Sequence, residues 1–229
     1  MNVAFIPVRG GSKSIPLKNI KPICGKPLVY WTVKAACECK YVDTVYVATD
    51  SDKIKEVSLR FKEEDPLFHK LQVIGRSAES ASDTASTESA MLEFADNYNF
   101  DNIVLVQATS PLLTSDALDK GFELFDSPET DSVLSVVRQK RFNWMTDKDG
   151  IAHPINYDVF HRPRRQEFDG YLVENGAFYI TSREDLIKTK NRISGRIRAI
   201  EMDEDSFFEI DEPSDWIIIE ALMKKVISK

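Results

Sequence analysis

Short apolar segments alternate along this chain with stretches whose apolar residues recur at helical spacing, and this alternation limits the fold more than any other feature. Segments 3–8, 44–49 and 103–107 have the length and composition of buried strands. Further strands are expected at 71–74, 132–137, 177–181 and 197–201. Helical spacing, N-cap residues and an initiating proline predict helices at about 28–39, 51–60, 84–98, 115–125, 184–189 and 213–226. The alternation predicts an α/β fold, with a mostly parallel, Rossmann-like sheet covered by helices on both faces.

The domain organisation is expected to be simple. The 229 residues suffice for one buried core, and no repeat or flexible linker divides them, so residues 1–229 are expected to form a single domain. Residues 138–170 and 182–205 are less regular than the rest. We therefore expect a small insertion or dimerisation arm within approximately 138–205.

The cysteine content and the hydropathy indicate a cellular location. Cys24, Cys37 and Cys39 are too few for a disulfide scaffold and lack the spacing of a zinc site, which indicates a reducing compartment. No run approaches the roughly 18 apolar residues of a membrane span, and the first residues lack a secretory leader. A cytoplasmic protein that does not enter a membrane is expected.

The charge is distributed unevenly. The net charge of −7 argues against general nucleic-acid binding. Residues 1–37 nevertheless contain six Lys and Arg and no Asp or Glu, so the other 192 residues carry −13. The cationic segment is either an anion-binding site or a chance cluster on a solvated surface, and charge alone leaves both open.

The loop after the first strand favours the anion site. It reads RGGSKSIPLKN from Arg9 to Asn19, and its two glycines, Gly10 and Gly11, allow the backbone to approach a ligand closely. Because Lys13 follows serine and a third glycine is missing, it is neither a P-loop nor a dinucleotide fingerprint. The carboxyl ends of parallel strands share one edge of a sheet, so this loop is expected to meet Asp50 and segment 107–111 there.

Several further segments, taken in order, carry a family resemblance. They are RSAESASDTAST at 76–87, QATSPL at 107–112, RPRRQ at 162–166, NGAFY at 175–179 and Glu-Ile-Asp at 209–211. Together with the glycine loop, they resemble the CMP-sialic acid synthetases, also called acylneuraminate cytidylyltransferases. The RPRRQ stretch and SVVR at 135–138 are most similar to the animal-type branch.

The resemblance implies a nucleotide-diphospho-sugar transferase-like fold and a reaction. In this family, the 2-hydroxyl of a nine-carbon 2-keto sugar acid attacks the α-phosphorus of CTP, which gives CMP-sugar and pyrophosphate. By resemblance, Arg9, Lys13 and Lys18 would hold the triphosphate and act in catalysis. The other nucleotide-binding residues that the resemblance implies are Gly10, Gly11, Ser12, Asn19, Arg76, Ala85 (through its backbone) and Thr87.

A metal site is expected at Glu209 and Asp211. Two residues apart in an extended segment, their carboxylates would share one face, and such a pair suits Mg²⁺. The alternative is a plain acidic surface, since five further acidic residues lie between 203 and 215. The family usually has Asp where this chain has Glu209, so Asp211 is the expected principal ligand and Glu209 is expected to bind directly, through water, or not at all.

The sugar acid carries a carboxylate and therefore calls for a cation. Arg162, Arg164 and Arg165 can supply it, with Arg162 in the catalytic set, unless they form a solvated basic loop. Gln107 and Tyr179 are expected at the sugar by resemblance, unless they are a strand-end polar residue and a core residue. The resemblance also implies a homodimer in which the arm completes the partner's sugar pocket.

Two other functions remain open from the sequence. One is cytidylyl transfer to a related acid such as KDN, legionaminic, pseudaminic or 3-deoxy-manno-octulosonic acid. The loop at residues 9–19 lacks the Ala-Arg, Ser-Thr-Arg, Leu-Pro pattern that is usual for the eight-carbon substrate. The other is a nucleotide-binding module without turnover, which would not need converging carboxylates.

Overall fold

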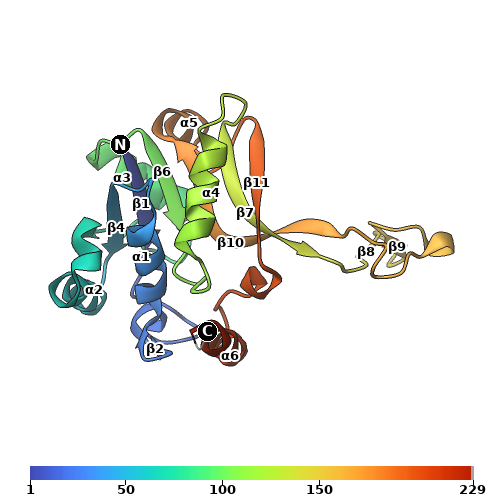
Figure 1. Cartoon of the computed structure of the whole chain (residues 1–229), viewed down its shortest axis with the longest axis horizontal. Helices are drawn as coiled ribbons and strands as arrows, with labels where there is room; N and C mark the ends of the chain where they lie inside the picture. Colours follow the sequence, from blue (N-terminus) through green and yellow to red (C-terminus); the bar gives the residue numbers. More distant parts are fainter. Residues whose placement is uncertain (228–229) are drawn as a thin grey trace.

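The computed structural model describes residues 1–227 and is built on a seven-stranded sheet (Figure 1). The strands are β1 (Asn2–Pro7), β4 (Thr44–Thr49), β5 (Leu71–Gly75), β6 (Asn102–Val106), β7 (Ser132–Gln139), β10 (Tyr171–Ser182) and β11 (Ile197–Met202). Their order across the sheet is β11-β7-β10-β6-β1-β4-β5. β10 runs antiparallel to both neighbours, and all other neighbouring pairs are parallel. The predicted mostly parallel, Rossmann-like α/β fold is confirmed.

Helices cover both faces of the sheet, and each face has its own apolar core. On one face, α1 (Leu28–Glu38), α2 (Asp52–Glu64) and α4 (Ser115–Phe125) pack against alternate residues of β1, β4 and β6. On the other face, α3 (Thr87–Asn97) and α5 (Arg183–Thr189) cover the remaining residues of these strands. Successive side chains of a strand point to opposite faces, which is why the apolar runs of β1 and β6 supply both cores.

A third core supports the loop after β1. The last helix, α6 (Pro213–Ile227), buries Trp216, Ile219 and Met223 against Ile15 of that loop and Ile23 of a small hairpin. The hairpin consists of β2 (Pro22–Ile23) and β3 (Lys26–Pro27), and its two turn residues, Cys24 and Gly25, both have positive φ. The C-terminal helix therefore holds the glycine loop in place over the end of the sheet.

The residues between β7 and β10 form an arm that leaves the body of the molecule (Figure 1). The arm contains a hairpin of β8 (Trp144–Thr146) and β9 (Ala152–Pro154), followed by the short 3₁₀ helix η3 (Val159–His161). The expected boundary of about 138–205 is too wide, because β10, α5 and β11 belong to the main body. β10 pairs with β6 through residues 178–182 and with β7 through residues 171–174 and 179–181.

The remaining elements and boundaries differ little from expectation. The other 3₁₀ helices are η1 (Lys18–Ile20), η2 (Pro66–Lys70) and η4 (Glu204–Phe207). The predicted helix at 84–98 begins only at Thr87, because the Ser86 hydroxyl caps it by accepting from the Ser89 N–H.

No helix within residues 1–227 combines the length and apolar character needed to cross a membrane.

Candidate active site

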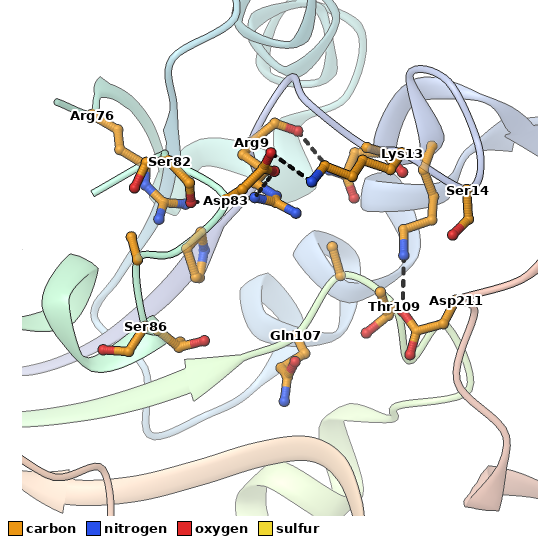
Figure 2. A pocket seen from close by; sticks show the side chains of 17 residues that line it. Arg9, Lys13, Ser14, Arg76, Ser82, Asp83, Ser86, Gln107, Thr109 and Asp211 are labelled. Carbon is orange, nitrogen blue, oxygen red and sulfur yellow. Dashed lines mark hydrogen bonds and ion pairs between the residues drawn. The ribbon is translucent and has the colours of Figure 1, made fainter. Parts of the chain in front are cut away.

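A cavity of about 570 Å³ opens at the carboxyl ends of β1 and β6 (Figure 2). The glycine loop, the segment before α3 and the segment after β6 line it, as the shared edge of parallel strands predicts. Of the predicted site residues, the cavity is lined by Arg9, Ser12, Lys13, Lys18, Asn19, Arg76, Ala85, Thr87, Gln107 and Asp211. Pro7, Ser14, Ser82, Asp83, Ser86, Ala108 and Thr109 complete the lining.

The two glycines of the loop have different surroundings. A Cβ on Gly10 would lie 2.9 Å from Cβ of Ser51, whereas a Cβ on Gly11 would have no atom within 4 Å. The Gly10 N–H donates to Oδ1 of Asp50 at 2.9 Å, and the Asn19 side chain donates to the Arg9 carbonyl at 3.2 Å. Gly10 therefore lets the loop pack closely on the end of β4, and Asn19 holds the backbone of the loop from the other side.

Arg9 and Lys13 share one carboxylate. Nη1 of Arg9 lies 2.9 Å from Oδ1 of Asp83, and Nζ of Lys13 lies 2.8 Å from Oδ2 of the same residue (Figure 2). Arg9 also donates to the Ser82 carbonyl at 3.3 Å. The hydrogen bond from Lys13, more than any other contact, holds the pKa of Asp83 below its ordinary value.

Lys18 connects the glycine loop to the expected metal segment. Its side chain is only 13% exposed, and Nζ donates to the Ile210 carbonyl at 2.6 Å and to Oδ1 of Asp211 at 3.1 Å. The Ile210 N–H in turn donates to the Thr109 carbonyl at 2.9 Å. Asp211 is thereby held beside the loop after β6, although the two segments are about a hundred residues apart.

Glu209 and Asp211 lie near one another but in different environments. Asp211 lines the cavity, whereas Glu209 is half-buried beside Gly176, whose added Cβ would lie 3.2 Å from Oε2 of Glu209. Burial raises the pKa of Glu209, and the neighbouring charge of Asp211 raises it further. Residues 1–227 contain no group of three or more His, Cys, Asp or Glu arranged for a metal. One or two carboxylates fit Mg²⁺, which takes its other ligands from phosphates and water.

The opposite end of the cavity is built by the segment before α3. Arg76 bonds to the Ser80 carbonyl and hydroxyl, and burial lowers its pKa. The Ala85 N–H donates to the Ser82 carbonyl at 3.3 Å, which folds the segment into turns along the cavity wall. This arrangement presents backbone groups and small hydroxyl side chains to a ligand.

The predicted sugar-binding residues are not all brought together. Gln107 lines the cavity. Tyr179 lies outside the lining, with 4% of its surface exposed, and its hydroxyl donates to Oε2 of Glu174 at 2.9 Å. Arg162 lies on the arm with its guanidinium 4.5 Å above the ring of Phe142, and Arg164 and Arg165 follow it there, so none of the three lines the cavity of its own chain.

Comparison with known proteins decides the family. A family model for cytidylyltransferases matches residues 3–205. The chain belongs to the cytidylyltransferase family. N-acylneuraminate cytidylyltransferase of Oncorhynchus mykiss is 39% identical to this cytidylyltransferase over 221 residues, which are 95% of this chain and 49% of that protein. The expected resemblance to the animal-type branch is confirmed, and the chain spans about half the length of such relatives.

Two further matches cover nearly whole proteins. CMP-N,N'-diacetyllegionaminic acid synthase of Legionella pneumophila is 26% identical to this cytidylyltransferase over 234 residues, which are 97% of this chain and 96% of that protein. A solved CMP:2-keto-3-deoxy-manno-octonic acid synthetase in complex with CTP superposes with a TM-score of 0.71 at 18% identity. It covers 98% of this chain and 99% of that one. At this identity, the superposition establishes the fold that the two chains share.

Proposed function

We propose that this cytidylyltransferase activates a sialic-acid-type sugar. It would join the CMP part of CTP to the 2-hydroxyl of a nine-carbon 2-keto sugar acid and release pyrophosphate. The convergence of Arg9, Lys13 and Lys18 on one cavity, in a member of the cytidylyltransferase family, carries the proposal. The names of the relatives from Oncorhynchus mykiss and Danio rerio support the sialic acid type.

The cations of the loop would act on the triphosphate. Arg9, Lys13 and Lys18 would hold it and stabilise the charge that develops on the departing pyrophosphate. Catalysis of phosphoryl transfer depends mainly on such electrostatic stabilisation and on positioning. Gly10, Gly11, Ser12 and Asn19 would shape the loop around the nucleotide. At the other end, Arg76, Thr87 and the Ala85 backbone would contact the cytidine.

The carboxylate side of the cavity would serve the sugar and the metal. Asp211 and Glu209 would hold Mg²⁺, which supplies positive charge at the α-phosphate and lowers the pKa of a hydroxyl bound to it. Gln107 would orient the sugar through its amide, which both donates and accepts. A Cβ on Gly176 would lie 3.3 Å from Nε2 of Gln107, so the missing side chain leaves this amide accessible.

A homodimer is proposed because the arm exposes apolar surface and arginines far from its own cavity. Phe160 is 88% exposed, and Trp144, Met145, Ile151, Ile155 and Val159 on the same arm are exposed as well. Such a patch suits a second copy of the chain. Arg162, Arg164 and Arg165 would then bind the sugar carboxylate in the partner's pocket, with Tyr179 behind it. Residues 1–229 would act as one cytidylyltransferase domain.

A cytoplasmic location is proposed from the cysteines. Cys24, Cys37 and Cys39 are free thiols, and free thiols persist in a reducing compartment. Fractionation of the source cells with an antibody to the protein tests this proposal, because recovery in a secreted or membrane fraction contradicts it.

Pyrophosphate release with CTP tests the reaction and the substrate together. We expect turnover with N-acetylneuraminic acid and less with KDN, legionaminic, pseudaminic and 3-deoxy-manno-octulosonic acids. Turnover highest with legionaminic acid would favour the second candidate, which the near full-length match to the Legionella pneumophila enzyme supports. CTP binding without pyrophosphate release in the presence of any of these acids would favour a nucleotide-binding module without turnover.

A further inference from the structure

Asp83 occupies a position that the proposed reaction does not explain. The reaction needs Arg9 and Lys13 to face a triphosphate, yet both already contact the carboxylate of Asp83, at 2.9 and 2.8 Å. Asp83 itself lines the cavity (Figure 2). An acidic side chain in an anion site normally weakens anion binding, so its presence between the two cations calls for a reason.

The segment that carries Asp83 is able to withdraw. Residues 76–86 form no strand and no helix, and their backbone–backbone hydrogen bonds stay within the segment, for example from Ala81 to Ser77 and from Ser82 to Glu79. Ser77 fixes the start of the segment by donating through its N–H and its hydroxyl to Glu93 of α3, whereas Ser82 and Asp83 bond to Arg9 and Lys13. The Asp83 side chain is 50% exposed. Few contacts outside the segment oppose its movement when the two cations find another partner.

We propose that Asp83 is a positioning residue that takes the place of the β- and γ-phosphates in the free enzyme and is displaced by them when CTP binds. This inference rests on the proposed function. By pairing with Arg9 and Lys13, the carboxylate holds both cations at the cavity in the free enzyme and competes with the phosphates for them. The triphosphate carries more charge than one carboxylate and displaces it.

The charges of the lining support an exchange of anions. Four cations, Arg9, Lys13, Lys18 and Arg76, and two carboxylates, Asp83 and Asp211, line the cavity. Removing Asp83 from the cations when CTP binds frees them for the β- and γ-phosphates. Its return after the reaction would compete with pyrophosphate and assist its release. A nucleoside monophosphate has no β- or γ-phosphate and gains nothing from the exchange.

Binding measured by calorimetry at low ionic strength tests the proposal with CTP, inorganic pyrophosphate and CMP. We expect Asp83→Asn to bind CTP and pyrophosphate about three- to tenfold more tightly than the wild type, because it removes a competitor that forms two half-exposed ion pairs. CMP affinity should change less than about twofold, since no competition is relieved. Asp83→Glu, which retains the charge, should restore affinities close to those of the wild type.

Glu79→Gln is the matched control, because Glu79 is an exposed acidic residue of the same segment and lies outside the cavity lining. It changes the net charge equally and should leave CTP affinity unchanged. Weaker CTP binding by Asp83→Asn overturns the inference, because Asp83 would then stabilise the site by holding the glycine loop and residues 76–86 together. Unchanged CTP binding overturns it as well. Equal tightening in both variants also overturns it, by assigning the effect to net charge. A wild type that binds no CTP overturns the proposed function itself.

Discussion

At the scale of single residues, Gly10 and Gly11 are neighbours in sequence but differ in the space that each leaves for a side chain. Gly10→Ala would place a Cβ 2.9 Å from Cβ of Ser51 and force the loop off β4, whereas Gly11→Ala would enter open space. We expect Gly10→Ala to lower kcat/KM for CTP at least about tenfold, since small displacements of positioning groups are costly. Gly11→Ala should stay within about threefold. Equal losses in the two variants would contradict this interpretation of the loop.

Arg9 and Lys18 are both expected to act on the triphosphate, but the structure distinguishes their effects on stability. Replacement of either by Ala should lower kcat about a hundredfold or more, because a pre-placed charge at the reacting phosphates is worth roughly 3 kcal/mol. Lys18→Ala should also destabilise the fold by about 1–3 kcal/mol, because the Ile210 carbonyl loses a charged donor.

Kinetics and urea unfolding of the two variants measure these effects. Lys21→Ala is a suitable control, because Lys21 is an exposed cation of the same segment that lies over Trp216 rather than at the cavity. It should leave turnover close to the wild-type value. A variant of Arg9 or Lys18 with normal turnover would remove that residue from the catalytic set.

Asp211 is the expected principal Mg²⁺ ligand, and Asp211→Asn tests it. The change keeps the shape but removes the charge, so activity should fall about a hundredfold and higher Mg²⁺ should restore only part of it. Glu209→Asp, which introduces the residue that is usual in the family, should have a much smaller effect. Glu204→Gln, at an exposed acidic residue of the same region, controls for charge. Full activity of Asp211→Asn at ordinary Mg²⁺ would contradict the assignment.

At the scale of elements, the sequence predicted the strands and helices of the body because their local patterns agree with their final environments. The helices at 28–38 and 115–125 differ from expectation by one residue or none. β10 was predicted only from 177 onward, because its first half leaves the sheet core for the exposed arm and an irregularity between Glu174 and Tyr179 interrupts its pattern. Local pattern alone does not reveal where such a strand will pair.

The candidate site was predictable as segments but not as contacts. The glycine loop and segment 76–87 line the cavity as expected, since loops after parallel strands share one edge. The meeting of the glycine loop with Asp50 was expected from the same rule, whereas the pairing of Arg9 with Asp83 across 74 residues has no local signal in the sequence. Tyr179 was expected at the sugar by resemblance, with a core position as the alternative, and its side chain lies in the second core.

The arm permits a test of the proposed dimer through complementation between subunits. Arg162→Ala should be inactive because it lacks the arm cation, and Lys18→Ala because it lacks a cavity cation. If the arm serves the partner, mixed dimers contain one intact site. Co-expression should then recover about a quarter of wild-type activity, because half of the dimers are mixed and each has one intact site of two. No recovery, although light scattering shows dimers, would contradict the sharing of sites.

At the scale of the whole molecule, three apolar cores meet at the site edge of the sheet. The two cores on the sheet faces fix β1 and β6, and the third, under α6, fixes the glycine loop through Ile15 and Ile23. Ile210 belongs to this third core, and its neighbours Glu209 and Asp211 carry the carboxylates. The packing of the C-terminal helix therefore also positions residues 209–211, and this core joins the first and last thirds of the chain.

Two cysteines in the first of these cores make the free energy of unfolding depend on pH in the alkaline range. Burial raises the pKa of Cys37 and of Cys39 to about 12, compared with roughly 8.5–9 in an unfolded chain. Between these values, the unfolded state releases protons that the folded state retains. The free energy of unfolding is therefore unaffected below about pH 8 and falls as the pH rises, by about 1.4 kcal/mol per pH unit for each thiol.

Urea unfolding under reducing conditions from pH 7 to 11 measures this slope. The double variant Cys37→Ala/Cys39→Ala should lose most of it and retain the smaller contribution of Tyr179, whose pKa burial raises to about 12. An unchanged slope in the double variant would show that other groups control alkaline unfolding.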